Sequence, residues 1–299
     1  MSRAHLTRFA WLSVGAAVLT IVLKGAAWWI TGSVSLLSDA MESFVNLAAA
    51  LVALTMLSLA AKPPDEEHAY GYSKAEYFAS GVEGLLILLA ATLIAYAAIE
   101  RLLAPQPIEM VGIGLVVSVV ASLVNFATSR ILRRAGLMHR SVALEADAKH
   151  LMTDVWTSAG IILGVAAVGL TGWWQLDPLI AIAVAVHILW TGVQLLRRSF
   201  SGLLDRAMPL VERQKILDVL DSYDEIGVRH HALLTREAAG RSFVTVHILV
   251  PGEWSVQRGH DLLEEIEARI RAAIPHACVL THLEPIGDPA SYEDIQLDR

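Results

Sequence analysis

Long apolar runs dominate the first two thirds of the chain. Each has about the 20 residues that a helix needs to cross a hydrocarbon core of about 30 Å. The runs cover residues 9–30, 35–60, 77–99, 110–132, 151–170 and 174–196. This pattern predicts an all-α transmembrane domain with six helices over residues 1–204.

Shorter elements follow the last apolar run. Apolar residues at helical or alternating spacing predict a helix at 209–223, strands at 228–236 and 242–250, a helix at 256–274 and a strand at 277–283. The order αββαβ indicates a small α+β domain over residues 205–286, with its helices on one face of one sheet. Residues 287–299 form a polar, acidic tail.

The composition also indicates a membrane protein. Of the 299 residues, 55% are hydrophobic and only 18% are charged, a balance that is rare in a soluble protein of this size. The formal net charge of -7 belongs to residues 205–299, because residues 1–204 hold 13 Lys and Arg and 13 Asp and Glu. This acidity excludes nucleic acid as the expected partner, since phosphate backbones are bound by an excess of Lys and Arg.

Arginines mark one side of the expected membrane domain. Arg3 and Arg8 precede the first run, and Arg197 and Arg198 follow the sixth. Lys and Arg concentrate in cytoplasmic segments of membrane proteins. We therefore expect a multi-pass protein of a bacterial inner membrane, embedded in the lipid bilayer, with both termini in the cytoplasm.

An internal repeat places polar residues in the second and fifth apolar helices. In both helices the polar positions recur at i, i+3 and i+7, which share one face at about 3.6 residues per turn. The two stripes are Asp39, Glu42 and Asn46 in the second helix, and Asp147, His150 and Asp154 in the fifth. Ionisable groups inside a bilayer are costly unless they are paired or hydrated, so they indicate an ion or proton path.

The two stripes predict a shared metal site if they face each other. Glu42, Asn46, His150 and Asp154 then supply four ligand groups, the number expected for tetrahedral Zn²⁺. The first Asp of each stripe lies one turn away and is expected to support the site. Since Cys278 is the only cysteine, metal binding must use oxygen and imidazole. The alternative is that the stripes only hydrogen-bond one helix to the other.

These residues resemble the cation diffusion facilitator family, and the resemblance runs from about residue 10 to residue 285. In that family the second and fifth helices each bring two ligands four residues apart. His150 and Asp154 match the fifth-helix pair, whereas Glu42 and Asn46 are not the usual residues of the second-helix pair. The resemblance implies a homodimeric antiporter that exports divalent transition-metal cations from the cytoplasm in exchange for protons.

Two further matches to the family lie between the apolar runs or beyond them. Asp65 and His68 are retained in a loop where the family's Asp and two His hold a second metal, but Tyr72 stands at the other His position, so the expected site is weak. Lys74 and Asp205 match a charge interlock near the dimer interface. The alternative is that they are two unpaired surface charges.

The resemblance also implies a ferredoxin-like second domain with a binuclear metal site. The matching residues are His231, His247, His260, His282 and Glu284. They fall on or beside the predicted strands and the second helix of this domain, so the fold can gather them. The alternative is that they are ordinary surface residues.

Zinc is the expected metal, both as the substrate and as a ligand of the cytoplasmic site. An oxygen-rich site shifts the relative preference toward Fe²⁺ or Mn²⁺, and Co²⁺ and Cd²⁺ are further candidates, but raw affinity still favours Zn²⁺. An enzyme is not expected, because the sequence has no Gly-rich phosphate loop, Cys pair or His-Glu-x-x-His run. A membrane-anchored metal sensor or scaffold, and a channel, are the alternative functions.

Overall fold

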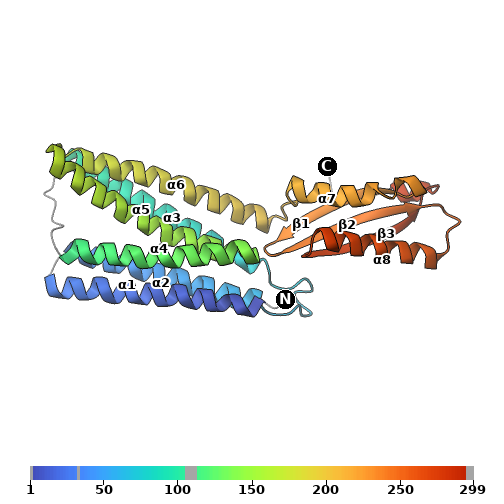
Figure 1. Ribbon diagram of the computed structural model, residues 1–299, viewed down its shortest axis with the longest axis horizontal. Helices are drawn as coiled ribbons and strands as arrows, with labels where there is room; N and C mark the ends of the chain where they lie inside the picture. The colour runs from blue at the N-terminus through green and yellow to red at the C-terminus, as the bar shows by residue number, and fades with distance from the viewer. Residues whose placement is uncertain (1–2, 32–33, 105–112, 294–299) are drawn as a thin grey trace. The chain divides into compact units, whose positions relative to one another are not determined.

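Two units make up the protein. The structure, a computed structural model, describes residues 3–31, 34–104 and 113–293. Within these ranges it does not describe the side chains of residues 3–4, 31–42, 113–115, 161, 165–166, 168–169 and 177. The units are Met1–Ser201 and Gly202–Arg299 (Figure 1).

Six long helices form the first unit after a short 3₁₀ turn, η1 (Arg3–Leu6). They are α1 (Thr7–Thr31), α2 (Val34–Ala60), α3 (Ala75–Leu103), α4 (Ile113–His139), α5 (Val142–Thr171) and α6 (Leu176–Leu203). Within the described residues, α1, α2, α3, α4 and α6 are long and apolar enough to cross a membrane. Five of the six expected crossings are therefore supported. The remaining helix, α5, carries four charged residues between Glu145 and Asp154.

Helix α5 lies at the centre of the packing in this unit. It contacts α2, α3 and α4, while α1 packs against α2 and α4. Leu57, Leu132 and Leu151 belong to one buried cluster of Ala and Leu side chains from α1 to α5. Helix α1 also contacts α5, so the polar face of α5 is surrounded by four other helices.

The start of α5 is fixed by a buried carboxylate of α3. Glu76 is fully buried and accepts hydrogen bonds from Ser141 Oγ at 2.7 Å and from the Ala143 amide at 3.4 Å. In addition, Arg198 of α6 donates to Glu145 of α5 through two guanidinium nitrogens. These contacts hold the axial position of α5 relative to its neighbours.

Glycines allow α3 and α6 to approach closely. A Cβ added at Gly84 would lie 3.0 Å from Leu196 Cγ, and one at Gly192 would lie 2.8 Å from Leu88 Cδ2. Small residues permit such approaches between helices in membranes, where van der Waals packing holds helices together. Ile87 and Ile188 are buried beside this contact. This packing fixes α3 against α6 and thereby places the inner face of α3.

The second unit has the expected order of elements. Its helices are α7 (Leu210–Asp221) and α8 (Val256–Ala273), its strands are β1 (Arg229–Ala238), β2 (Arg241–Val250) and β3 (Ala277–Pro285), and its 3₁₀ turns are η2 (Asp224–Ile226) and η3 (Pro289–Tyr292). The strand order is β1-β2-β3, with β1 antiparallel to β2 and β2 parallel to β3. The helix–strand–strand–helix–strand order is thus confirmed. The turn η3 lies within the expected acidic tail.

Alternation along β2 separates the core from the open face of the sheet. Val244, Val246 and Ile248 are buried and join the core cluster with residues of α7 and α8. Because successive strand residues point to opposite faces, His247 lies on the face away from this core. The sheet therefore has one apolar face and one face that carries imidazole groups.

The α3–α6 contact predicts the effect of filling a glycine position. Replacing Gly192 with Val should force Leu88 aside and cost about 1–3 kcal/mol through overpacking. The apparent melting temperature in detergent should fall by roughly 2–10 °C, measured by size-exclusion chromatography after heating. Gly15→Val is the matched control, because a Cβ at Gly15 of α1 meets no atom within 4 Å. Equal melting temperatures for the two variants would contradict this packing account.

Candidate functional site

Three of the four predicted transmembrane ligands meet between α2 and α5. His150 Nε2 donates to Asn46 Oδ1 over 2.8 Å, and Asn46 Nδ2 donates to the Asp154 carboxylate. Asn46 and His150 are buried, with 5% and 3% of their surfaces exposed. The side chains of Asp39 and Glu42 lie outside the described residues, but Glu42 precedes Asn46 by about one turn of α2.

Two residues that the stripes do not contain complete the surroundings. Asn125 of α4 donates to Asp154 Oδ2 over 3.1 Å, so this carboxylate accepts from two amides. Glu83 of α3 is 1% exposed, and its Oε2 lies 3.8 Å from His150 Nδ1. Neither residue belongs to the i, i+3, i+7 repeat, so the repeat did not predict them. The available signal was Glu83, which is the only Asp, Glu, Lys or Arg in the apolar run 77–99.

Asp147 has a separate partner. It is 1% exposed and accepts a hydrogen bond from Ser13 Oγ of α1 over 3.0 Å. This bond joins α5 to α1, whereas His150 and Asp154 belong to the cluster with α2, α3 and α4. A supporting role for Asp147 stays a prediction, and the structure gives it a contact through which it can hold the axial rotation of α5.

The buried cluster has the donor chemistry of a divalent-cation site. It offers an imidazole nitrogen, a carboxylate oxygen and an amide oxygen on neighbouring side chains. Such nitrogen and oxygen donors suit Zn²⁺ and its first-row neighbours. Since the donors also hydrogen-bond one another, a cation would replace bonds that the side chains already make.

In the predicted loop site, Tyr72 occupies the Asp65 carboxylate through a hydrogen bond. Tyr72 Oη donates to Asp65 Oδ2 over 2.5 Å, and the His68 amide donates to Asp65 Oδ1 over 2.8 Å. The Tyr72 hydroxyl is the main cause that lowers the pKa of Asp65, and the same bond raises the pKa of Tyr72. The His68 and Tyr72 rings lie 4.3 Å apart between centroids. Asp65 and His68 are thus neighbours, with a phenol where a third ligand would stand.

The proposed charge interlock involves one residue from each unit. Asp205 accepts from Arg236 Nη1 over 3.0 Å within the second unit. Lys74 occupies the position before α3 in the first unit. A pairing of Lys74 with Asp205 stays a prediction.

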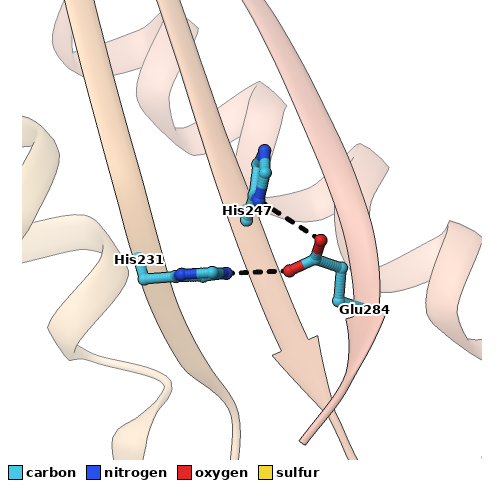
Figure 2. Close-up of side chains that lie close together, drawn as sticks. All are labelled: His231, His247 and Glu284. Carbon is cyan, nitrogen blue, oxygen red and sulfur yellow. Dashed lines mark hydrogen bonds and ion pairs between the residues drawn. The ribbon is translucent and has the colours of Figure 1, made fainter. Parts of the chain in front are cut away.

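A second cluster lies on the open face of the sheet in the second unit. Glu284 Oε2 lies 2.8 Å from His231 Nε2, and Glu284 Oε1 lies 3.3 Å from His247 Nδ1. Figure 2 shows the three side chains turned toward one another from three adjacent strands. One ligand atom from each lies within 4.8 Å of the others, so the three can hold a metal ion.

Strand register explains why these residues meet. His231 is paired with His247, and His247 is paired with His282, so the three imidazoles form one row across β1, β2 and β3. Glu284 follows His282 by two residues and shares its face. A bulge begins after His231, where Ala232 has a φ of 50°. Bulges re-aim side chains, and a left-handed non-glycine residue is a strained feature beside this cluster.

The remaining two predicted cytoplasmic ligands lie at different distances from this cluster. His282 Nε2 is 3.6 Å from Glu284 Oε1, and its side chain is 65% exposed. His260 lies exposed on α8 and is not part of the group of three. The structure therefore gathers three of the four histidines around the Glu284 carboxylate and leaves His260 apart.

Comparison with known proteins gives matches along nearly the whole chain. Residues 10–204 match the family described as the cation efflux transmembrane domain, and residues 208–286 match the cation efflux protein, cytoplasmic domain. The uncharacterized transporter sll1263 of Synechocystis sp. is 52% identical over 291 residues, which cover 97% of this chain and 94% of that protein.

Relatives with a named activity also match over most of their length. The cation-efflux pump FieF of Citrobacter koseri is 31% identical over 271 residues, covering 90% of this chain and 89% of the pump. The cation-efflux pump FieF of Escherichia coli O139:H28 is 30% identical over 281 residues, covering 93% and 92%.

The loop geometry predicts that a single substitution would create a metal site. Tyr72→His should add one Zn²⁺ per chain, because a neutral imidazole offers a lone pair near pH 7 while a phenol of raised pKa keeps its proton. Isothermal titration with Zn²⁺ in detergent measures the stoichiometry. Tyr72→Phe is the control and should add none. An unchanged stoichiometry for Tyr72→His would show that Asp65 and His68 are wrongly oriented for a shared ion.

Proposed function

The chain belongs to the cation efflux family of membrane transporters, also called the cation diffusion facilitator family, and from this premise we propose that it exports divalent transition-metal cations in exchange for protons. It is a multi-pass membrane protein and a transporter, not an enzyme. The proposal concerns the coupling ion, the metal and the residues that bind it.

One observation carries the proposal. Asn46 and His150, which are buried, and Asp154, which is half-buried, form a continuously hydrogen-bonded cluster between α2 and α5. The helices around it are mostly apolar enough to cross a membrane, and ionisable side chains at such depth mark ion paths. We assign Glu42, one turn before Asn46, as the fourth ligand. Packing alone gives no reason for an imidazole and a carboxylate at this position.

Proton exchange follows from the chemistry of these ligands. With His150 neutral, Glu42 and Asp154 carry a charge of -2 that a divalent cation balances. Ligation requires the deprotonated forms, so protons and metal compete for the same lone pairs. When the site faces a more acidic compartment, protonation of His150 and one carboxylate favours release of the metal. The same groups thus carry metal outward and protons inward.

The arrangement in the membrane follows from the charge pattern. Two cytoplasmic termini require an even number of crossings, so α5 must cross the membrane with the other five helices. The cytoplasmic unit, residues 205–286, then lies beside the inner membrane surface, and its ferredoxin-like fold joins two chains in a homodimer. His231, His247, His282 and Glu284 would bind metal there, with His260 contributing across the dimer.

A metal sensor or scaffold is the second candidate, and the cytoplasmic cluster is the observation that favours it. His231, His247 and Glu284 can bind a metal without any transport. A sensor, however, has no use for a buried cluster between membrane helices. Metal flux in purified vesicles separates the two functions, because a sensor gives none.

The imidazole of the transmembrane cluster should be required for both flux and coupling. His150→Ala removes one ligand and one proton acceptor, so zinc flux in proteoliposomes should fall at least about tenfold, equivalent to about 1.4 kcal/mol. Its dependence on external pH should also weaken. His187→Ala is the matched control, because His187 is exposed on α6 beside Trp156. Zinc flux that is unchanged by His150→Ala would exclude this mechanism.

The amide at position 46 should tune the choice of metal. We expect wild type to transport Zn²⁺ ahead of Fe²⁺ and Mn²⁺. Asn46→Asp adds a carboxylate beside Asp154, so the KM for Zn²⁺ should fall by roughly tenfold through Coulomb attraction. The maximal rate should also fall, because release becomes harder. Initial rates for each ion in vesicles measure both quantities, and preferred Mn²⁺ transport by wild type would contradict the zinc assignment.

A further inference from the structure

We propose that Glu83 of α3 is a positioning residue of the transport site, which holds the His150 ring so that Nε2 points at the cation. This inference rests on the proposed function, because it concerns the same buried cluster. It adds a third helix to a site that the sequence pattern assigns to α2 and α5 alone.

Glu83 is deeply buried in the first unit. The side chain is 1% exposed, and neither carboxylate oxygen has a hydrogen-bond partner among the residues whose side chains the structure describes. A buried carboxylate without donors is costly, and natural proteins keep such groups where they serve a function. His150 Nδ1 lies 3.8 Å from Glu83 Oε2.

The His150 ring lies beside the Glu83 carboxylate. Its Nδ1 also has no hydrogen-bond partner among the described side chains, while its Nε2 donates to Asn46 Oδ1. The two nitrogens thus face different neighbours. Nε2 faces the amide and, beyond it, Asp154, whereas Nδ1 faces the Glu83 carboxylate. The ring lies between the proposed cation-binding groups and Glu83.

The position of the single N–H proton decides what each ring nitrogen of His150 can bind. A neutral imidazole has one N–H group, and here Nε2 uses it toward Asn46. A cation bound at Nε2 takes that nitrogen's lone pair, so the N–H must then lie on Nδ1. Glu83 is the acceptor in position to receive it after a shift of less than about 1 Å. Histidines that bind metals commonly donate their other N–H to a carboxylate, which orients the ring and makes it a stronger ligand.

The test measures metal affinity in the full-length protein with the cytoplasmic ligands His231 and His247 replaced by Ala. Co²⁺ is the probe, because its absorption spectrum also reports the coordinating atoms. Glu83→Leu should weaken Co²⁺ binding about 10–100-fold. Glu83→Gln should weaken it less, because the amide oxygen still accepts from Nδ1. Glu100→Gln, at an exposed position on the same helix, is the control and should match the parent.

Two further outcomes separate positioning from ligation. If Glu83 acts through His150, Glu83→Gln should leave the spectrum's ligand-field bands in place and should have no additional effect in a His150→Ala background. Binding by Glu83→Leu within threefold of the parent would overturn the inference, as would a Glu83→Gln spectrum that has lost an oxygen ligand. If His150→Ala itself leaves Co²⁺ affinity unchanged, the proposed transport site fails as well.

Discussion

Buried polar side chains on apolar helices must form hydrogen bonds with one another, and this constraint organises the first unit. A buried donor or acceptor without a partner costs more than the net gain from a typical hydrogen bond. Three ionisable side chains of helix α5 have neighbours on three different helices: Asp147 meets Ser13 of α1, His150 meets Asn46 of α2, and Asp154 meets Asn125 of α4. The polar contacts of α5 therefore fix its rotation, and apolar packing, which lacks direction, supplies close contact around it.

The cytoplasmic unit gathers its polar groups by a different route. Helix packing is not needed to align His231, His247 and His282, because strand register already places them in one row. The period of two along a strand then separates this row from Val246 and Ile248, which face the helices. The same alternation that buries the core thus places these imidazoles on the open face, so a metal bound there would leave the core undisturbed.

The sequence predicted the elements better than their contacts. Hydropathy located both ends of α1 and α2 closely but missed the start of α5: the fifth run was expected at residues 151–170, whereas α5 begins at Val142. Its first turns are polar yet helical, because Glu76 and Arg198 bind them from neighbouring helices. The i, i+3, i+7 repeat brought Asn46, His150 and Asp154 together correctly. A repeat between two helices could not reveal Glu83, because its neighbours in sequence are apolar and only tertiary packing sets it beside His150.

Asn46 gives the cluster a property that a carboxylate at the same position lacks. An amide has both a donor and an acceptor, so Asn46 binds Asp154 through Nδ2 and His150 through Oδ1 at the same time. A carboxylate has acceptors only, and beside Asp154 it would need a cation or a proton to offset the repulsion. The amide therefore holds the proposed ligands together without a cation. Under the proposed function, cation binding would break these hydrogen bonds, which would lower the affinity and favour release. Fast release is a useful property in a transporter, since each ion that is bound must also be let go.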